Sequence, residues 1–493
     1  MQSCAGGCAV VDVEVVVVGG GNAGFSAAHS AAERGARVLL LEKAPEDAAG
    51  GNSYYTAGAF RFAFDDLDEI ADLLEPDERH PDTVVPAYPA GAFHADMDRV
   101  TGGRCDPVLT DVLISRSTDT VRWLASKGLT WRLMYERQAY LSGGKWVFSG
   151  GLHVGTVGGG KGLIAGHTAA AREEGVEVRY GAEVTALHLD DRGVTYRCDG
   201  VEHRVSAGAV VLAAGGFEAS AQRRARHLGP EWARAHVRGT PTNTGDVLDL
   251  ALAAGAAPHG DWTTCHSTAW DADADPDGGN RELTNQLTRQ SYPLGIVVNK
   301  AGERFVDEGA DFRNYTYAKY GREVLRQPDG RAFQLFDAQT RPLLRAEEYD
   351  SHPVAAAQAD TLQELAAALG IDADRLERTV RSFNESIVDA EFDPAVKDGR
   401  AARVDPPKSH WALALDTPPY YGFAVGCGIT FTFGGLHVDA GARVLDTSGA
   451  PIPGLFACGE VVGGLFSGNY PGGTGLTSGA VFGRLAGAGA AEA

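Results

Sequence analysis

Short glycine runs at both ends of the chain have the spacing that binds a dinucleotide. Gly19-Gly20-Gly21-Asn22-Ala23-Gly24 follows the apolar run 13–18 and precedes an alanine-rich stretch. In a strand–turn–helix unit of this kind the first glycine forms the tight turn. The second lets the backbone approach a pyrophosphate, and the third permits close packing of helix on strand. Glu42 follows a second apolar run, 38–41, and is placed to accept hydrogen bonds from ribose hydroxyls, which disfavours a 2′-phosphate.

A matching segment lies more than 400 positions away, near the other end of the chain. Cys458-Gly459-Glu460 ends an apolar run, and Gly468 to Gly475 opens a helix-like stretch of small residues. A Gly-Glu pair after a strand places a carboxylate beside a bound polyol. A glycine run that opens a helix presents backbone N–H groups to an electron-rich ligand edge. We therefore expect one binding domain assembled from both termini, with another segment inserted between them.

Two further glycine-rich turns bring backbone close to the same ligand. Residues 50–53 read Gly-Gly-Asn-Ser and are followed by Ala57-Gly58, and the apolar run 209–212 leads into Ala213-Ala214-Gly215-Gly216. Residues beside these motifs complete the predicted site. The predicted cofactor contacts are Gly19, Gly21, Asn22, Ala23, Gly24, Glu42, Lys43, Gly50, Gly51, Asn52, Ser53, Ala57, Gly58, Val184, Ala214, Gly215, Gly216, Gly459, Glu460, Gly473, Thr474, Gly475 and Leu476.

Composition narrows the class of partner. The 493 residues carry a net charge of −21, which argues against nucleic acid or an anionic membrane surface. An anionic substrate would need a local cationic island, and His266, Arg289 and Arg313 are candidates, whereas Arg281 reads as an ordinary surface arginine. The seven cysteines, Cys4 and Cys8 among them, show no disulfide framework, zinc spacing or haem motif. We expect no metal, no membrane span, a cytoplasmic location and a separate electron acceptor.

The periodicity of the chain predicts the elements that position these motifs. Strands are expected at 13–18, 38–41, 176–184, 194–198, 209–212, 434–439 and 455–458, and helices at 25–34, 108–128, 361–369 and 372–390. Residues 65–106 are acidic and rich in proline, which is typical of a surface excursion. The composition changes after about residue 261 to Trp, His, Arg and Tyr at irregular spacing, which indicates the start of the inserted segment.

Taken in order, these motifs resemble the FAD-dependent fumarate reductase and succinate dehydrogenase flavoprotein superfamily. Besides the glycine turns, the resemblance includes the run from Gly302 to Glu308 and the pair Gly434-Gly435. Within this superfamily the chain is most similar to the tricarballylate dehydrogenase branch. The segments that indicate the branch are 52–62, Cys265-His266, 311–315 and 469–473.

The resemblance implies an α/β fold in which a Rossmann-like FAD-binding domain, built from both termini, carries an inserted α+β capping domain. The expected bounds are 10–261 and 432–493 for the FAD-binding domain and 262–431 for the cap. In membrane-bound members of the superfamily a histidine after the second glycine turn bonds covalently to FAD. This chain has Asn52-Ser53-Tyr54 there, so non-covalent FAD is expected.

The resemblance also assigns chemistry to the cap. These flavoproteins transfer a hydride and a proton across a C–C bond next to a carbonyl or carboxylate. Arg313 matches, within one residue of spacing, the arginine that fumarate reductases use as proton donor, although a salt bridge to Glu308 or Asp311 would also account for it. If Arg313 takes a proton, a relay through Asp311 or Arg289 must drain it. Otherwise Arg313 clamps a carboxylate and a tyrosine moves the proton.

Two departures from fumarate reductases affect the substrate. Phe431 stands where they have histidine, and Tyr470 stands where they have arginine. Because each charge-assisted hydrogen bond contributes about 1.5–3 kcal/mol, the loss of both cations disfavours plain fumarate or succinate chemistry. Tyr470-Pro471-Gly472 also resembles the 3-ketosteroid dehydrogenases, whose tyrosine hydrogen-bonds a substrate ketone. His266 matches the carboxylate-binding histidine of the superfamily.

The sequence therefore predicts an enzyme that desaturates a C–C bond beside a carboxylate, with tricarballylate as prototype. Arg313, Tyr470 and His266 are the predicted catalytic residues, and Thr432, Arg289 and Phe431 the predicted substrate contacts. Desaturation of a ketosteroid or of a specialised metabolite, and a fumarate reductase-like reaction in the reducing direction, stay open as alternatives. A flavin-binding electron carrier is the non-enzymatic alternative, and it would not need a cationic island.

Overall fold

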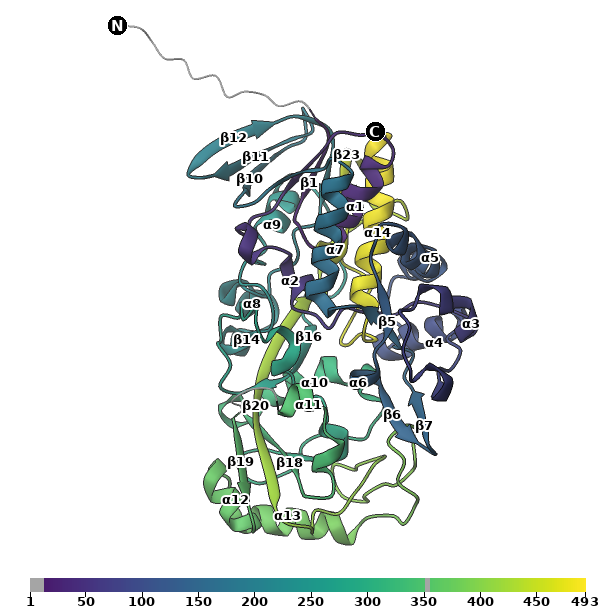
Figure 1. The fold of residues 1–493 in the computed structure, drawn as a ribbon. Helices are drawn as coiled ribbons and strands as arrows, with labels where there is room; N and C mark the ends of the chain where they lie inside the picture. Colours follow the sequence, from purple (N-terminus) through teal and green to yellow (C-terminus); the bar gives the residue numbers. More distant parts are fainter. Residues whose placement is uncertain (1–12, 351–354) are drawn as a thin grey trace, which may run out of the picture.

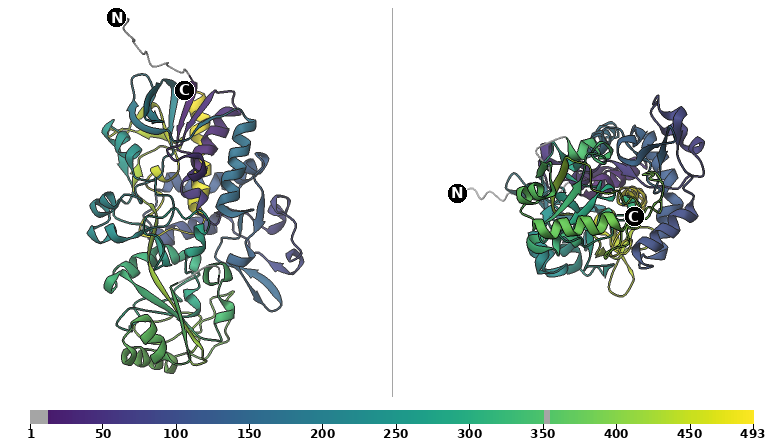
Figure 2. Two further views of the ribbon diagram at one scale, coloured as in Figure 1. Left: turned by 60° about the vertical axis from the view of Figure 1, so that its left-hand side comes forward. Right: turned by 90° about the horizontal axis from the view of Figure 1, so that it is seen from below.

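The structure, a computed structural model, describes residues 13–350 and 355–493. Cys4 and Cys8, for which the sequence predicts no metal, lie outside the described residues, as do the first positions of the predicted FAD-binding domain. The described chain has two main sheets, one at each end of an elongated molecule, and the left view in Figure 2 shows the same division, whereas the right view looks at the molecule from below. Among the described residues no helix is long and apolar enough to cross a membrane.

The first sheet joins strands from both ends of the chain, in the upper part of Figure 1. Its order is β22-β23-β13-β1-β2-β9, and every pair is parallel except β22 with β23. Buried valines and leucines fill β1, β2 and β13, as expected for parallel strands covered on both faces. The strands are β1 (Val13–Val18), β2 (Val38–Leu41), β9 (Glu177–Arg179), β13 (Ala207–Leu212), β22 (Arg443–Leu445) and β23 (Pro451–Ala457).

Helices from the two termini pack together beside this sheet. Helix α1 (Asn22–Ala32) lies against α14 (Thr474–Ala491), and both are drawn near the C-terminus in Figure 1. A Cβ on Gly487 would lie 2.1 Å from the carbonyl oxygen of Ala27, so glycine allows the two helices to approach closely. The prediction of an α/β, Rossmann-like domain assembled from both termini is thereby confirmed.

The glycine turn after β1 has the geometry that its spacing predicts. Gly19 has φ +111°, and a Cβ there would lie 2.3 Å from the carbonyl oxygen of Ala213. Gly24 sits in the first turn of α1, where a Cβ would lie 1.9 Å from the carbonyl oxygen of Gly19. The first glycine therefore forms the tight turn and the third allows helix α1 to pack on the strand.

The second sheet surrounds the long strand β20 (Tyr420–Thr432), which crosses the lower half of Figure 1. Its other strands come from the predicted insertion and from the segment just before it, and a separate apolar core lies between the sheet and helices α12 and α13. The bounds of these elements are β14 (His236–Val237), β16 (Cys265–Asp271), β17 (Ile296–Val298), β18 (Ala332–Phe336), β19 (Ala356–Ala359), α10 (Tyr317–Leu325), α11 (Ala346–Tyr349), α12 (Leu362–Leu369) and α13 (Ala373–Glu385).

The remaining elements surround the two sheets. A three-stranded antiparallel sheet of β10, β11 and β12 extends from the first domain, and α3, α4 and α5 lie together on the right of Figure 1. The bounds are α2 (Gly51–Tyr54), β3 (Ala59–Phe60), α3 (Leu67–Ile70), β4 (Thr83–Val84), α4 (Ala90–Thr101), α5 (Pro107–Ser126), β5 (Trp131–Leu133), α6 (Tyr135–Gln138), β6 (Ala139–Ser142), β7 (Lys145–Phe148), β8 (Val154–Thr156), α7 (Gly159–Glu173), β10 (Glu183–His188), β11 (Gly193–Cys198), β12 (Val201–Val205), α8 (Ala221–His227), α9 (Asp246–Ala253), β15 (Pro258–His259) and β21 (Gly435–Leu436).

Three predicted elements differ from the structure. The expected strand at 176–184 is divided into β9 and β10 because Gly181, with φ +65°, turns the chain between them. The expected helix at 372–390 ends at Glu385, where Ser386 donates a hydrogen bond back to the carbonyl of Phe383. The strand expected at 434–439 is only the two-residue β21. The exact domain bounds at 261 and 431 stay predictions.

Candidate active site

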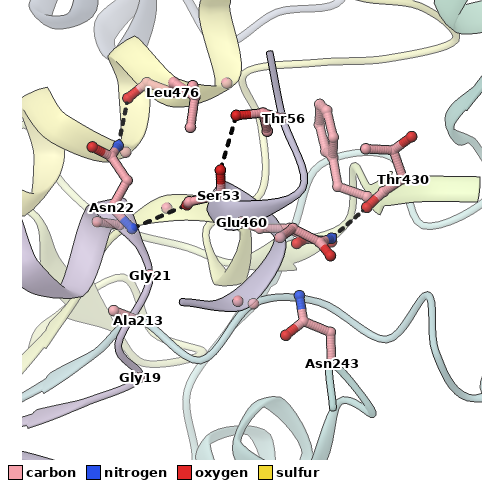
Figure 3. Close-up of a pocket in the computed structure, with 18 of the residues that line it drawn as sticks. Gly19, Gly21, Asn22, Ser53, Thr56, Ala213, Asn243, Thr430, Glu460 and Leu476 are labelled. Carbon is pink, nitrogen blue, oxygen red and sulfur yellow. Dashed lines mark hydrogen bonds between the residues drawn. The ribbon is translucent and has the colours of Figure 1, made fainter. Parts of the chain in front are cut away.

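One elongated cavity runs from the glycine turns of the first sheet to the strands of the second. We call the part beside Glu42 and Lys43 the nucleotide end and the part beside Arg313 and Tyr470 the substrate end. Figure 3 shows the turn of Gly19 and Gly21, with Asn22, Ser53 and Thr56, facing Thr430, Asn243 and Glu460. The cavity therefore joins motifs from the two termini to side chains from the insertion.

At the nucleotide end, the first turn of α1 is held in place by side-chain hydrogen bonds. The Asn22 amide nitrogen donates to the carbonyl of Leu476 at 2.8 Å, and the backbone N–H of Asn22 donates to Ser53 Oγ at 3.0 Å (Figure 3). These contacts fix three predicted cofactor motifs relative to one another: the 19–24 turn, the 50–53 turn and the start of α14.

Glu42 lies at the end of β2, where the sequence places a ribose acceptor. Its two carboxylate oxygens accept from the N–H groups of Gly20, at 2.7 Å, and Ala44, at 2.8 Å. Burial raises the pKa of this carboxyl despite those two bonds. Lys43 beside it pairs with Asp246 at 2.8 Å and Glu183 at 3.2 Å, so its ammonium is held by side chains of the cavity rim.

Asn52 links the glycine turn to the second sheet. Its amide nitrogen donates to Glu218 Oε1 at 2.7 Å and to the carbonyl of Thr430 at 2.6 Å, and its amide oxygen accepts from the N–H of Thr240 at 2.9 Å. Asn52 lines the cavity, as predicted for a cofactor contact. Its side chain in addition fixes the end of β20, which carries substrate-end residues.

Glu460, predicted to face a polyol, has a second carboxyl beside it. Glu460 Oε1 accepts from the N–H of Thr432 at 2.8 Å. Glu218, which is fully buried, accepts from Asn243 at 2.7 Å and lies in hydrogen-bonding contact with Glu460. Burial raises the pKa of Glu218 and, together with the neighbouring Glu218 charge, that of Glu460. Two such carboxyls are expected to share a proton.

Most predicted cofactor residues line the cavity, and a minority support it from behind. Gly24, Gly50, Gly58, Gly216 and Thr474 do not line it. Gly216 lies so close to Glu460 that a Cβ there would be 2.2 Å from its carboxylate oxygen. Those that line it are Gly19, Gly21, Asn22, Ala23, Glu42, Lys43, Gly51, Asn52, Ser53, Ala57, Val184, Ala214, Gly215, Gly459, Glu460, Gly473, Gly475 and Leu476.

At the substrate end, Arg313 is buried and surrounded by neutral acceptors. One terminal nitrogen donates to Gln290 Oε1 at 2.6 Å, and the other donates to Gln138 Oε1 at 3.0 Å and to the carbonyl of Arg137. Within the described residues Arg313 forms no ion pair, and its Nε has no hydrogen-bond partner. Burial, with the nearby guanidiniums of Arg345 and Arg137, lowers the pKa of Arg313 to about 9.

A second buried arginine, Arg238, lines the same end of the cavity. It follows β14 and donates to Thr430 Oγ1 at 2.7 Å and to Asn285 Oδ1. In the described part of the chain Arg238 likewise forms no ion pair, and its Nε has no partner. Burial lowers its pKa as well. Removing a guanidinium from water without a counterion is costly, so two such groups in one cavity indicate an anionic ligand.

Aromatic side chains form the wall between these arginines. Tyr470 Oη lies 2.5 Å from Tyr317 Oη, and the Tyr470 ring packs edge-on against Phe431, with centroids 5.1 Å apart. Burial and the neighbouring Tyr317 raise the pKa of Tyr470 well above its usual value, so Tyr470 stays neutral and serves as a hydrogen-bond donor. Thr432, at the end of β20, also lines the cavity.

The structure places His266 behind this wall. Its ring stacks on Phe431 with centroids 5.2 Å apart, and it packs edge-on against Tyr317 and Tyr470. Neither ring nitrogen has a partner among the described residues, and burial lowers the pKa of His266 well below its usual value. From this position a neutral imidazole supports the aromatic wall, and His266 does not line the cavity, as the predicted direct contact with substrate would require.

Arg289 is directed away from the cavity, which corrects the prediction that it binds substrate. Its guanidinium pairs with Asp271 at 2.7 Å and donates to the carbonyls of Gln286 and Thr288. Asp311, the other residue predicted to relay a proton from Arg313, is also engaged elsewhere. Its carboxylate pairs with Arg99 at 2.5 Å and with Lys397 at 3.3 Å. Arg281 stacks over the ring of Tyr54, outside the cavity, in line with the expectation of a peripheral role.

Several substrate-end residues were missed from sequence. Arg238 has no recognisable motif around it, and Tyr317 and Gln290 lie among many polar residues at irregular spacing. The one available signal is that an acidic chain needs buried cations to hold an anion. This signal points to arginines in general and does not separate Arg238 and Arg313, which face the cavity without ion pairs among the described residues, from Arg289. The missed lining residues are Arg137, Gln138, Arg238, Asn285, Gln290, Tyr317 and Thr430.

Comparison with known families agrees with this geometry. The model of a family described as "FAD binding domain" matches residues 14–476, which covers both glycine-rich ends and the insertion between them. The chain belongs to this FAD-binding family. The fumarate reductase (cytochrome) of Shewanella frigidimarina is 31% identical over 489 residues, which cover 97% of this chain and 77% of the relative.

Two further matches support the same family. The urocanate reductase of Eggerthella lenta is 31% identical over 508 residues, which cover 97% of this chain and 75% of that protein. The open conformation of a flavocytochrome c3 fumarate reductase superposes with a TM-score of 0.74 at 28% identity, over 99% of this chain and 79% of that one. The chain is therefore an FAD-dependent oxidoreductase that acts on C–C or C=C bonds, homologous to the fumarate reductase and urocanate reductase family.

The residues of the nucleotide end fit FAD. A Cβ on Gly21 would meet Ser53 Oγ at 3.5 Å and the carbonyl oxygen of Gly50 at 3.9 Å, both ordinary van der Waals distances, so this position opens into the cavity and leaves room for a pyrophosphate against the backbone. Glu42 and Glu460 both line the cavity, where they are predicted to face the ribose and ribityl hydroxyls of FAD. The cavity then continues to the substrate end, where an isoalloxazine ring and a substrate can meet.

Proposed function

We propose that this protein is an FAD-dependent dehydrogenase that oxidises a C–C bond next to a carboxylate, with tricarballylate or a similar polycarboxylate as substrate. The observation that carries the proposal is the pair of buried guanidiniums, Arg238 and Arg313, which face one cavity without ion pairs in the described part of the chain. A substrate with more than one carboxylate supplies negative charge to this cationic end of the cavity.

Each side chain at the substrate end has a distinct task in this reaction. Bound FAD supplies the hydride acceptor. Arg238, with Asn285 and Thr430 orienting its guanidinium, holds one carboxylate, and Tyr470 donates a hydrogen bond to an activating oxygen. Arg313 accepts the proton from the carbon next to the one that loses hydride. Because its pKa is lowered, Arg313 loses and accepts a proton more readily near neutral pH than an exposed arginine does.

The proton taken by Arg313 needs a route to solvent. Arg313 donates to the carbonyl of Arg137, whose own guanidinium pairs with Glu348 at 2.8 Å and with Glu347. Although burial alone would raise it, Arg137 and Arg345 hold the pKa of Glu348 below its usual value. Glu347 is about one-third exposed, with 34% of its side chain accessible. We assign the uptake of the proton to the carboxylates of Glu348 and Glu347, in place of Asp311 and Arg289. Arg137 itself stays protonated, because against the effect of burial these two carboxylates raise its pKa.

A ketone substrate is the second candidate, favoured by the tyrosine pair. Tyr470 and Tyr317, with hydroxyls 2.5 Å apart at the cavity wall, can together hydrogen-bond a carbonyl oxygen. Such a substrate would leave both arginines without counterions, so we rank it below a polycarboxylate. The reducing direction uses the same residues, with Arg313 giving up its proton instead of accepting one.

Anaerobic flavin bleaching separates these functions. Purified, FAD-loaded protein is mixed without oxygen with tricarballylate, with succinate or with a 3-ketosteroid, and flavin absorbance is followed. We expect tricarballylate to bleach the flavin faster than the other two. Bleaching by the ketosteroid alone would contradict the proposal. If only alkenes such as fumarate or urocanate reoxidise chemically reduced enzyme, the reducing direction is correct.

Non-covalent attachment of FAD and a separate electron acceptor belong to the same proposal. The 50–58 turn holds no histidine that could form the covalent bond. Acid precipitation should therefore release all flavin into the supernatant, whereas flavin in the pellet would show covalent attachment. Turnover with an artificial acceptor such as a dye, but only slowly with oxygen, is expected of an enzyme that passes its electrons to another protein.

A further inference from the structure

A cluster of two histidines and one aspartate lies outside the cavity, where none of the preceding functions uses it. Asp106 precedes α5, His259 ends β15, and His437 follows β21, so the three come from distant parts of the chain. Each offers one ligand atom, and the three atoms lie within 4.8 Å of one another. No spacing pattern in the sequence could reveal this group, because the fold alone assembles it.

The three side chains lie next to one another. His259 Nε2 lies 3.2 Å from Asp106 Oδ2, and the rings of His259 and His437 stack with centroids 4.2 Å apart and planes inclined by 22°. All three side chains are partly exposed, His259 to 30% and Asp106 to 20%, so a small ion can reach them from solvent.

The backbone around the cluster is fixed independently of any ion. Asp106 Oδ1 accepts from the N–H groups of Val108 and Leu109, which caps α5 and leaves Oδ2 for His259. The N–H of Asp106 donates to the carbonyl of Gly464 at 2.8 Å, and the N–H of His437 donates to that of Ala257 at 2.8 Å. The three ligands are thus held by three hydrogen-bonded segments before a metal arrives.

The ligand set selects a class of metal. Imidazole nitrogens with one carboxylate oxygen suit zinc and similar transition metals, whereas calcium and magnesium prefer oxygen ligands only. Three protein ligands also leave a position for water. An ion pair accounts for Asp106 and His259 but not for His437, whose ring forms no hydrogen bond in the described part of the chain.

We propose that Asp106, His259 and His437 bind one Zn²⁺ ion. The ion connects the start of α5 to β15 and to the residue that follows β21. The Gly463-Gly464 turn packs against this site, since a Cβ on Gly464 would lie 2.5 Å from the His259 ring. The next residues, Leu465 and Phe466, line the cavity. Zinc therefore fixes one cavity wall and stabilises the fold without taking part in the redox step, and the site does not depend on the proposed substrate.

Zinc titration of the full-length, FAD-loaded protein tests the site. The purification tag is removed and the protein is treated with a chelator, because a histidine tag would bind zinc itself. Calorimetry should then show one Zn²⁺ per chain, and the melting temperature should rise with zinc concentration. Added Co²⁺ should give the visible absorption of a nitrogen- and oxygen-ligated ion, whereas Mg²⁺ should have no effect.

Variants identify the ligands. His437→Ala and Asp106→Asn should each weaken zinc binding by at least about tenfold, and asparagine keeps the oxygen that caps α5. His94→Ala is the matched control, because His94 faces a single carboxylate, Asp111, at 3.6 Å on the surface and should bind no zinc. Cys105→Ser tests the adjacent thiol and should also leave zinc binding unchanged.

Three results would overturn the zinc site. They are no binding of either Zn²⁺ or Co²⁺, binding that is unchanged in both His437→Ala and Asp106→Asn, and binding that disappears only in Cys105→Ser. If His437→Ala fails to fold, Asp106→Asn and the Co²⁺ spectrum decide the question. None of these outcomes depends on which substrate bleaches the flavin.

Discussion

At the nucleotide end of the cavity the walls are backbone and small side chains from four glycine-rich turns. At the substrate end they are arginine, glutamine and tyrosine side chains from separate helices and strands. The backbone N–H groups of these turns suit one type of ligand. The glycines themselves tolerate few substitutions, since a Cβ at Gly19 or Gly24 would overlap nearby backbone atoms of the same protein. Side chains such as Arg238 can be exchanged without moving the backbone.

This difference explains how proteins that share one FAD-binding fold can act on different substrates. The fumarate reductase and the urocanate reductase that resemble this chain are each 31% identical to it, yet their names give different substrates. The FAD-binding turns can stay constant while the substrate-end side chains change. Substitutions at the two ends should therefore have separable effects, on cofactor retention at one end and on turnover or substrate affinity at the other.

The largest effect is expected from Gly21→Val at the nucleotide end. A Cβ there would come no closer than 3.5 Å to any atom, so the fold should survive, but the added side chain occupies the space proposed for the pyrophosphate. We expect the purified variant to lack flavin absorbance while its circular dichroism spectrum stays that of a folded protein. Gly91→Val is the control, because Gly91 lies on α4 with no atom within 4 Å of an added Cβ. Full flavin content in Gly21→Val would contradict the assignment.

Arg313→Gln should have the next largest effect, at the substrate end. Removing a general acid or base costs about 10²–10⁴-fold in kcat, and glutamine keeps a hydrogen-bond donor without the proton-transfer capacity. Flavin content should be unchanged, since Arg313 does not contact the glycine turns. Stopped-flow flavin reduction measures the step directly. Turnover near that of the unaltered enzyme would exclude Arg313 as the proton carrier.

The pH profile shows which way Arg313 moves its proton. Its pKa is lowered to about 9, so the proton-accepting form grows as the pH rises toward that value. In the oxidising direction kcat/KM should increase by about tenfold per pH unit below pH 9 and level off above it. In the reducing direction kcat/KM should instead fall above pH 9. Arg313→Gln should abolish this rise or fall of kcat/KM with pH. A pH dependence that remains in the variant belongs to another group.

Tyr470→Phe is expected to have the smallest effect. The change removes one neutral hydrogen bond, which contributes about 0.5–1.5 kcal/mol and corresponds to about a 2- to 10-fold loss in kcat/KM. Tyr317→Phe is the matched control, because it breaks the same hydroxyl pair from the other side. A loss in Tyr470→Phe as large as in Arg313→Gln would make the tyrosine the proton carrier.

Much of the fold could be predicted from sequence because its signals are local. The run 13–18, the glycine turn and Glu42 lie within one short unit, and the second glycine run opens α14 where expected. The errors also have local causes: Gly181 divides a predicted strand, and Ser386 ends a helix whose polar pattern continues to 390. Glycine and hydrophobic periodicity report on backbone geometry, which is what these elements need.

The substrate end could be predicted only in part because tertiary packing decides it. Arg289 and Arg313 both lie in the insertion, and nothing near them in sequence shows that Asp271 engages one and leaves the other facing the cavity. His266 was placed at the right junction, but Phe431 and Tyr470 cover it. Arg238 follows a strand of two residues and was missed altogether.

The central claim, that Arg238 holds a carboxylate of the substrate while Arg313 carries the proton, is tested most directly at Arg238. Steady-state kinetics of the unaltered enzyme and of Arg238→Met are compared on tricarballylate and on glutarate, which lacks the central carboxylate. We expect kcat/KM for tricarballylate to fall by about 10- to 100-fold, mainly through KM, as the loss of one charge-assisted bond implies. For glutarate the fall should be clearly smaller, because glutarate lacks the central carboxylate that we assign to Arg238, and Arg238→Lys should recover part of the loss on tricarballylate. Equal losses on both substrates, or no loss on either, would contradict the account.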